Sequence, residues 1–163
     1  MNMMSTTNAS NEWKILQFND FLEMDTSLKD WESFLECDEC EPLHHPTYVR
    51  ALIHREQAKL RMFVVYSNDE IKAIAPFYIS KSSIPVRLSV ITLTKVSFRI
   101  LRMVGDDFSI AKDVDRNEIY ELVMMELAKH RDFDLVHFRD VPEEGHLWKG
   151  LVQTIVPTSP WSK

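Results

Sequence analysis

The chain has 163 residues, which is the length of one domain and is enough to bury a sizeable hydrophobic core. Its formal net charge of -6 argues against a general nucleic-acid-binding protein, because such proteins normally present a basic face. No apolar run approaches the roughly 20 residues that a membrane-spanning helix requires, and the polar start has no signal-peptide pattern. With two cysteines and eight methionines, the composition fits a reducing cytoplasm, where we expect the protein to be located.

The composition along the chain predicts one folded domain with loose ends. Residues 1–11 are rich in Ser, Thr and Asn, and we expect them to form a disordered tail. The folded domain is expected over residues 12–156. Residues 157–163 contain two prolines and would begin a linker or a frayed C-terminus.

The first part of the domain predicts one strand and two helices. Trp, Ile and Phe side chains indicate a short strand over residues 13–18. Apolar side chains at helical spacing predict a helix over residues 28–36, and any of the polar residues 25–27 would serve as its cap. Pro42–Pro46 is a break, and a second helix is expected from about Thr47.

The middle of the chain carries the clearest strand pattern. Residues 60–66 and 71–79 are β-branched and aromatic, and the turn residues 67–69 join them. So short a connection requires antiparallel pairing. A third run, residues 86–104, would hold one or two more strands, separated from the hairpin by Ser82, Ser83 and Pro85.

The last part predicts a capped helix, a strand and a short helix. Asp115 and Glu118 have the spacing of a capping box at the start of a helix that reaches about His130. Residues 133–138 form an apolar strand, and a short helix follows Pro142. The predicted order β-α-α-β-β-β-α-β-α indicates a mixed α/β fold with a largely antiparallel sheet flanked by helices.

Two cysteines and two histidines lie close together after the first helix. Cys37, Cys40, His44 and His45 are all chemically suitable zinc ligands. A structural zinc site normally takes its second ligand pair from about 12 or more residues away, so we expect packed cysteines at a helix end and no metal. A redox role is also disfavoured, because this C-x-x-C pair does not follow a strand.

Two groups of polar residues are candidates for a binding cleft. His44, His45 and Tyr48 would act as acid/base groups, or else His45-Pro46 only shapes the entry to the second helix. Asp106 and Asp107 follow Gly105 at a predicted strand end, where α/β folds tend to bind ligands. There they would hold or deprotonate a substrate amine, or else form a solvated turn. No residue is assigned a catalytic role.

The chain has only three glycines, Gly105, Gly145 and Gly150, and they are scattered. A phosphate-binding loop needs clustered glycines, because only a bare backbone lets N–H groups approach phosphate oxygens closely. We therefore expect this chain alone to bind no acyl-CoA or other nucleotide cofactor.

Several short matches, taken in order, connect the chain with a known family. They are Trp31 and Phe34, His45-Pro46 with Tyr48, the hairpin residues 71–77, residues 101–105 with the acidic Asp106, Asp107 and Asp113, residues 133–136, and Val141-Pro142. On these residues the chain, over roughly residues 13–155, resembles the N-terminal half of the cellulose-biosynthesis acetyltransferase-like (CelD/BcsL) family, relatives of the GNAT-type N-acetyltransferases.

The resemblance implies a GNAT-like fold and a longer protein with two such halves. The whole protein would transfer an acetyl or other acyl group from acyl-CoA to an amine or hydroxyl of a sugar or cell-envelope precursor. The acyl-CoA loop would lie mainly in the second half, since the pattern Arg/Gln-x-x-Gly-x-Gly/Ala does not occur here. The alternative is a non-catalytic structural or interaction domain, which a filled groove between the splayed strands would favour.

The implied partner is a second GNAT-like half in the same or a longer chain. Separated from it, the domain would expose apolar surface around Trp148, Leu151, Ile155 and Val156, and we expect self-association.

Overall fold

The computed structural model describes residues 4–8, 11–24, 28–36, 41–88 and 91–155. Its strands form one sheet in the order β1-β2-β3-β4-β5-β7, and β6 pairs with β4 outside this path. The strands are β1 (Met4–Asn8), β2 (Asn11–Phe18), β3 (Lys59–Ser67), β4 (Glu70–Leu88), β5 (Ile91–Met103), β6 (Ser109–Ile110) and β7 (Leu135–His137). All pairs are antiparallel except β5 with β7.

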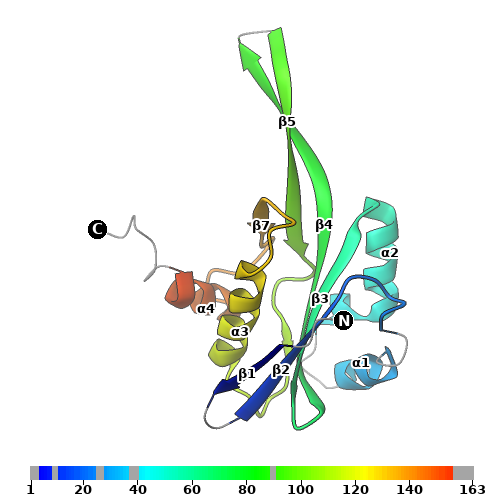
Figure 1. Cartoon of the computed structure of the whole chain (residues 1–163), viewed down its shortest axis with the longest axis vertical. Helices are drawn as coiled ribbons and strands as arrows, with labels where there is room; N and C mark the ends of the chain where they lie inside the picture. The colour runs from blue at the N-terminus through cyan, green and yellow to red at the C-terminus, as the bar shows by residue number, and fades with distance from the viewer. Residues whose placement is uncertain (1–3, 9–10, 25–27, 37–40, 89–90, 156–163) are drawn as a thin grey trace.

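Helices cover both faces of this sheet (Figure 1). They are α1 (Leu28–Leu35), the 3-10 turn η1 (Pro42–His44), α2 (Pro46–Glu56), α3 (Arg116–Ala128) and α4 (His146–Ile155). The predicted class, a mixed α/β fold with a largely antiparallel sheet flanked by helices, is confirmed. Among the described residues, no helix is both long enough and apolar enough to cross a membrane.

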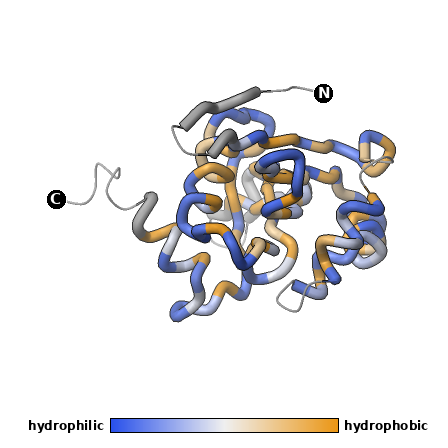
Figure 2. Tube along the Cα trace, turned by 90° about the horizontal axis from the view of Figure 1, so that it is seen from below, coloured by the Kyte–Doolittle hydropathy of each residue, from blue (hydrophilic) through white to orange (hydrophobic). Residues whose placement is uncertain are grey.

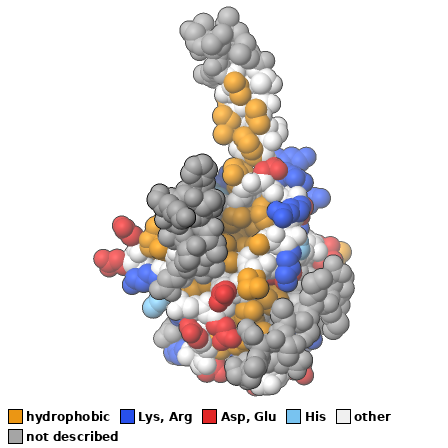
Figure 3. All heavy atoms as spheres, turned by 60° about the vertical axis from the view of Figure 1, so that its left-hand side comes forward, with side chains coloured by type: hydrophobic (Ala, Val, Ile, Leu, Met, Phe, Trp, Pro, Cys, Tyr) orange, Lys and Arg blue, Asp and Glu red, His pale blue; other side chains and the backbone are white. Residues whose placement is uncertain are grey.

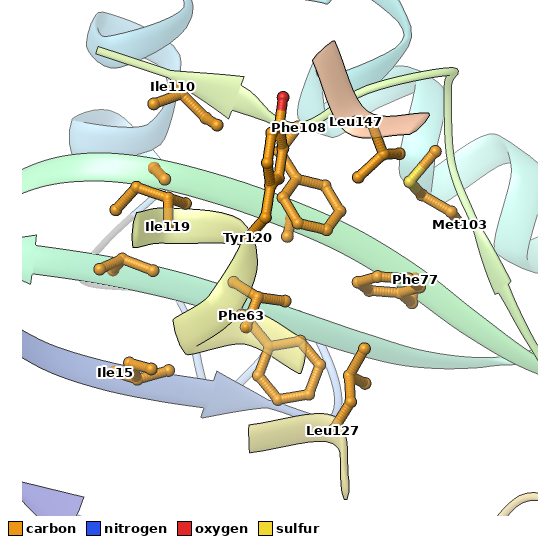
Figure 4. Close-up of a cluster of buried hydrophobic side chains, with 14 of the residues drawn as sticks. Ile15, Phe63, Phe77, Met103, Phe108, Ile110, Ile119, Tyr120, Leu127 and Leu147 are labelled. Atoms are coloured by element: carbon orange, nitrogen blue, oxygen red, sulfur yellow. The ribbon is translucent and has the colours of Figure 1, made fainter. Parts of the chain in front are cut away.

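Alternation along β3 divides the core into two layers. Met62 and Val64 face one side and pack with Trp31 of α1 and Val49 of α2. Phe63 faces the other side, into a cluster formed with α3 and α4 (Figure 4). Burial of β3 on both faces explains its apolar run over residues 62–65, and the buried Arg61 is a charged exception that pairs with Asp132. Hydrophobic and hydrophilic residues alternate along the covering helices (Figure 2), and α1 and α4 are clearly amphipathic.

The β3–β4 hairpin turns as its sequence predicts. Asn68 and Asp69 both adopt positive φ angles, 52° and 60°, the left-handed conformation that a two-residue hairpin loop requires and that Asn and Asp tolerate. The register runs from Ser67 opposite Glu70 to Lys59 opposite Ile79.

The separation that we expected at Ser82, Ser83 and Pro85 is wrong. β4 continues through these residues to Leu88, and β5 pairs with it back to Met103, opposite Phe77. Beyond Ile79, β3 no longer borders β4. A proline lacks an N–H and is tolerated in a strand with an open edge, so Pro85 does not end this one.

One smaller expectation also needs correction, and another cannot be tested here. Residues 4–8, placed in the disordered tail, instead form β1, which pairs with β2 from Met4 opposite Ile15 to Asn8 opposite Asn11. Backbone pairing at a sheet edge does not need the apolar pattern that residues 4–8 lack. The cap proposed within residues 25–27 lies outside the described residues.

The capping box at α3 is realised only in part. The Asp115 carboxylate caps the helix by accepting the Asn117 N–H at 2.9 Å. Glu118 instead accepts the indole N–H of Trp13 at 2.7 Å, which ties α3 to β2. The spacing of Asp115 and Glu118 is that of a capping box, but the Glu118 carboxylate accepts a hydrogen bond from the distant Trp13 and not from the helix N-terminus.

Candidate functional site

An open pocket of about 310 Å³ lies where β5 and β7 end, between these strands, α2 and β4. Its polar lining consists of three carboxylates, two guanidinium groups and two phenols, from Glu41, Asp106, Asp140, Arg55, Arg139, Tyr48 and Tyr78. Leu43, Leu52 and Val104 add apolar lining, and Met103 borders the pocket although its side chain packs in the cluster on the other face of the sheet.

The pocket lies where the pairing of two parallel strands ends. β5 and β7 pair over three positions only, the last being Arg102 opposite His137. Just beyond these ends, Gly105 has a φ of 77° and Asp140 a φ of 56°. Left-handed residues turn a chain sharply, and a non-glycine residue in this conformation carries strain, which is common at ligand sites.

Gly105 is required at its position for a second reason. A Cβ added there would lie 2.9 Å from Cγ of Glu41 and 3.0 Å from Nε2 of His44. The close approach therefore lets the chain before α2 pack against the end of β5, and it brings the Glu41 side chain to the pocket wall.

His44 has a structural role and is not an acid/base group of the pocket. It is fully buried, and its Nε2 lies 2.8 Å from the carbonyl oxygen of Val104. A carbonyl only accepts, so Nε2 carries the proton and Nδ1 accepts the Ser109 hydroxyl at 2.8 Å. Burial lowers the pKa of His44 to about 4, which keeps the ring neutral.

His45 and Tyr48 have different fates. His45 is exposed at the N-cap of α2, where its Nδ1 accepts the Thr47 N–H at 3.3 Å. This corresponds to the structural alternative, in which His45-Pro46 shapes the helix entry. Tyr48, one turn further along α2, lines the pocket and is 41% exposed.

Asp106 and Asp107, expected to act together, are on opposite sides of the β5–β6 connection. Asp106 lines the pocket. Asp107 accepts the Tyr120 hydroxyl at 2.8 Å and the Phe108 N–H at 2.7 Å, so it joins this connection to α3. Burial raises the pKa of Asp107, an effect opposed by the Tyr120 and Phe108 hydrogen bonds and by Arg116.

Glu41 was not among the sequence candidates, yet its carboxyl group lines the pocket and has a shifted pKa. Partial burial raises its pKa, and the neighbouring carboxylates of Asp106 and Asp107 raise it further, against the N–H of Leu43. Because the Glu41 carboxyl group lies close to Asp106 and has a raised pKa, the two groups can share a proton, or they can bind a cation in place of that proton.

The opposite side of the strand separation is filled with apolar side chains. Met103, Phe108 and Leu147 are each at most 4% exposed, and they pack there together with Phe77 (Figure 4). Helix α4 is pressed onto α3 at this point, because a Cβ on Gly150 would lie only 2.4 Å from the Tyr120 ring.

The N-terminus of α3, which could attract an anion in another setting, is occupied by acidic side chains. Asp115 caps it, Glu118 follows in the first turn, and Asp113 precedes it in an ion pair with Lys72 at 2.8 Å. The Asp115 carboxylate already accepts the Asn117 N–H here, so it would compete with a phosphate group and weaken the usual attraction of a helix N-terminus for anions.

The described residues contain no group of three or more His, Cys, Asp and Glu side chains placed to hold a metal ion. Cys37 and Cys40 of the candidate zinc set lie outside the described residues.

The predicted exposed patch on α4 is correct for only one of the residues that can be judged. Trp148 is 45% exposed, but Leu151 is buried in the core. Val156 and the side chain of Ile155 lie outside what the structure describes. The alternation within α4 places Leu147 and Leu151 on its inner face.

Five of the seven polar pocket residues were missed from the sequence: Glu41, Arg55, Tyr78, Arg139 and Asp140. A usable signal exists for Arg139 and Asp140, because they lie two and three residues after the end of β7, much as Asp106 lies three residues after the end of β5. Parallel strands bring their C-terminal ends to the same edge of a sheet. Glu41, Arg55 and Tyr78 come from other parts of the chain, and no local sequence pattern predicts that these parts contact this edge of the sheet.

No protein-family model and no curated protein sequence matches the chain. The chain is similar to two solved structures. One is a probable acetyltransferase, with 12% identity and a TM-score of 0.48 over 85% of this chain and 86% of that one. The other is the aminoglycoside N-acetyltransferase AAC(6')-Iy in complex with CoA, with 13% identity and a TM-score of 0.47 over 91% of this chain and 89% of that one. The first of these proteins is described as a probable acetyltransferase, and CoA is bound only in the second.

Proposed function

We propose that this chain is a GNAT-like domain of the CelD/BcsL acyltransferase type that supplies an acceptor-binding pocket. The observation that carries the proposal is the polar pocket where β5 and β7 separate. Open α/β sheets bind ligands at the carboxyl ends of such strands.

The pocket's chemistry supports a small polar acceptor with amine or hydroxyl groups. Carboxylates of Asp106 and Asp140 can accept hydrogen bonds from ammonium or hydroxyl groups. The phenols of Tyr48 and Tyr78 offer flat apolar faces with a polar tip. A volume of about 310 Å³ suits one or two sugar rings, at the small end of ligand pockets. An amino sugar of a cell-envelope precursor fits this description.

The same structure supports placing acyl-CoA elsewhere. The other side of the separated strands is filled by Met103, Phe108 and Leu147, and the start of α3 is acidic. Acyl-CoA would then be held by a second GNAT-like half, with this domain contributing acceptor contacts only.

Calorimetry with the purified chain tests the proposal. We expect weak binding of glucosamine, near 1 mM or about -4 kcal/mol, and no binding of acetyl-CoA. Asp106→Asn should weaken glucosamine binding about tenfold by removing a charge-assisted contact. Asp30→Asn, on the exposed surface of α1, is the matched control and should change nothing.

Each result decides between functions. Micromolar acetyl-CoA binding would contradict the proposal that a second half binds acyl-CoA, and it would indicate a complete acyltransferase. Failure to bind glucosamine, glucose and acetyl-CoA would favour a non-catalytic interaction domain. Glucosamine binding that is equal in the Asp106→Asn and control variants would place the site outside this pocket.

A further inference from the structure

A long two-stranded arm extends from the sheet and has no part in the pocket. The arm consists of residues 80–88 of β4 and 91–99 of β5. β3 borders β4 only as far as Ile79, and β7 borders β5 only from Ile100, so among the described strands each arm strand has the other as its one partner. About nine residues per strand give a length of roughly 30 Å (Figure 1).

Such a ribbon is incomplete as a structural unit. Both of its outer edges present backbone N–H and C=O groups that no described strand pairs, and such edges are templates for association. A lone two-stranded hairpin is only marginally stable in water. The arm therefore gains stability from any partner that covers it.

The arm's side chains add an apolar surface. Ile84 lies directly opposite Val96, so the two share one face, and they are 58% and 41% exposed. Val86 continues this face and is 42% exposed. Figure 3 shows apolar side chains along the projecting arm.

The arm is also cationic in an acidic protein. Residues 80–99 hold four of the chain's 19 Lys and Arg residues and none of its 25 Asp and Glu residues. The rest of the chain therefore carries a formal charge of -10, given the total of -6. Lys81 lies opposite Arg99, and like charges in such a pair are destabilising. Arg99 has Asp134 at 3.4 Å, whereas Lys81 and Lys95 have no acidic partner among the described residues.

These features select a protein surface and not a bilayer as the partner. A ribbon with two open edges cannot enter hydrocarbon, where unpaired backbone groups are very costly. The arm of a second copy is excluded as the partner, because both arms carry positive charge and would repel each other. The acidic remainder of the chain is complementary, but the arm points away from its own α3 and α4 (Figure 1). A second copy of the chain can present this surface.

The exposed surface of α3 and α4 has the matching chemistry. Glu121 on α3 and the pair Glu143 and Glu144 before α4 are exposed carboxylates. Met125 and Trp148 are exposed apolar side chains on the same two helices, at 53% and 45%. Acidic and apolar groups together are what the cationic, apolar arm requires.

We propose that the arm of one copy binds the α3–α4 surface of a second copy, and that the reciprocal contact closes a two-fold symmetric dimer. This proposal does not depend on the function of the pocket.

Sedimentation of the whole chain at low and high salt tests it. We expect a dimer whose dissociation constant rises with salt. Lys81→Glu/Lys95→Glu should weaken it at least about tenfold, as should Glu143→Lys/Glu144→Lys. An equimolar mixture of these two variants should form heterodimers, because both contacts then join opposite charges. Lys29→Glu, an exposed charge reversal on α1, should leave the dimer intact.

Four outcomes would overturn the proposal. They are a monomer at the highest soluble concentration, a dimer insensitive to the arm variant, a mixture that stays monomeric, and binding to phosphatidylserine vesicles that the arm variant abolishes. All substituted residues are exposed, and circular dichroism with the melting temperature verifies that each variant is folded. Ile84→Thr tests the apolar contact separately, since it retains β-propensity and charge.

Discussion

Buried His44 should make the stability of this protein depend on pH. Its ring is held neutral by burial, which lowers its pKa from 6.5 to about 4. Between these values the unfolded chain binds a proton that the folded chain does not. Stability is therefore fully present above pH 6.5 and falls as the pH falls toward 4. Protonation would also give Nδ1 a hydrogen and disrupt its bond from Ser109.

The magnitude follows from these two pKa values. From pH 7 to pH 5 the loss of unfolding free energy attributable to His44 is about 2 kcal/mol. Other groups contribute as well: burial lowers the pKa of His130, in the same sense, and raises the pKa of Asp107, in the opposite sense. A comparison with His44→Gln isolates the histidine, because these groups remain in both proteins.

Urea unfolding at pH 7 and pH 5 measures the effect. Wild type should lose about 2 kcal/mol more than His44→Gln across this interval. The variant should be less stable at pH 7 by about 1–3 kcal/mol, since glutamine does not reproduce both bonds of the ring. Equal pH dependence in both proteins would refute the reasoning. If the variant does not fold, proton NMR of the wild type suffices: a His44 ring that titrates near pH 6.5 while the protein is folded gives the same refutation.

Two further substitutions test the packing behind the filled side of the strands. Gly150→Ala should destabilise the fold by about 1–3 kcal/mol despite its helix propensity, because the new Cβ meets the Tyr120 ring at 2.4 Å; stabilisation in urea unfolding would contradict this contact. Tyr120→Phe should cost about 1–2 kcal/mol by removing the hydroxyl that Asp107 accepts at 2.8 Å; an unchanged urea midpoint would mean that this bond contributes nothing.

Much of the fold could be predicted because its signals are local. The apolar stripe of α1, the turn at Asn68 and Asp69 and the cap at Asp115 each depend on a few neighbouring residues. The arm could not be predicted in the same way. Ser82, Ser83 and Pro85 are typical of a loop, and only their pairing with β5 outside the sheet keeps them extended.

The pocket was harder to predict because distant elements form it. Tyr48 was identified from its place at the entry to a helix and Asp106 from its place at the end of a strand, and both line the pocket. His44 was considered for acid/base chemistry since histidine titrates near neutrality, but only the structure shows that burial removes this capacity. Arg55 and Tyr78 depend on how α2 packs on the sheet, which no local pattern reports.

The contrast between Asp106 and Asp107 shows why adjacency in sequence does not imply a shared role. After Gly105 turns the chain, Asp106 lines the open pocket, while Asp107 is hydrogen-bonded to Tyr120 and Phe108 on the α3 side. The first carboxylate is available to a ligand, and the second is used to close the space that α4 covers. One residue pair thus serves both sides of the separated strands: it leaves a polar opening on one side and helps to seal an apolar layer on the other.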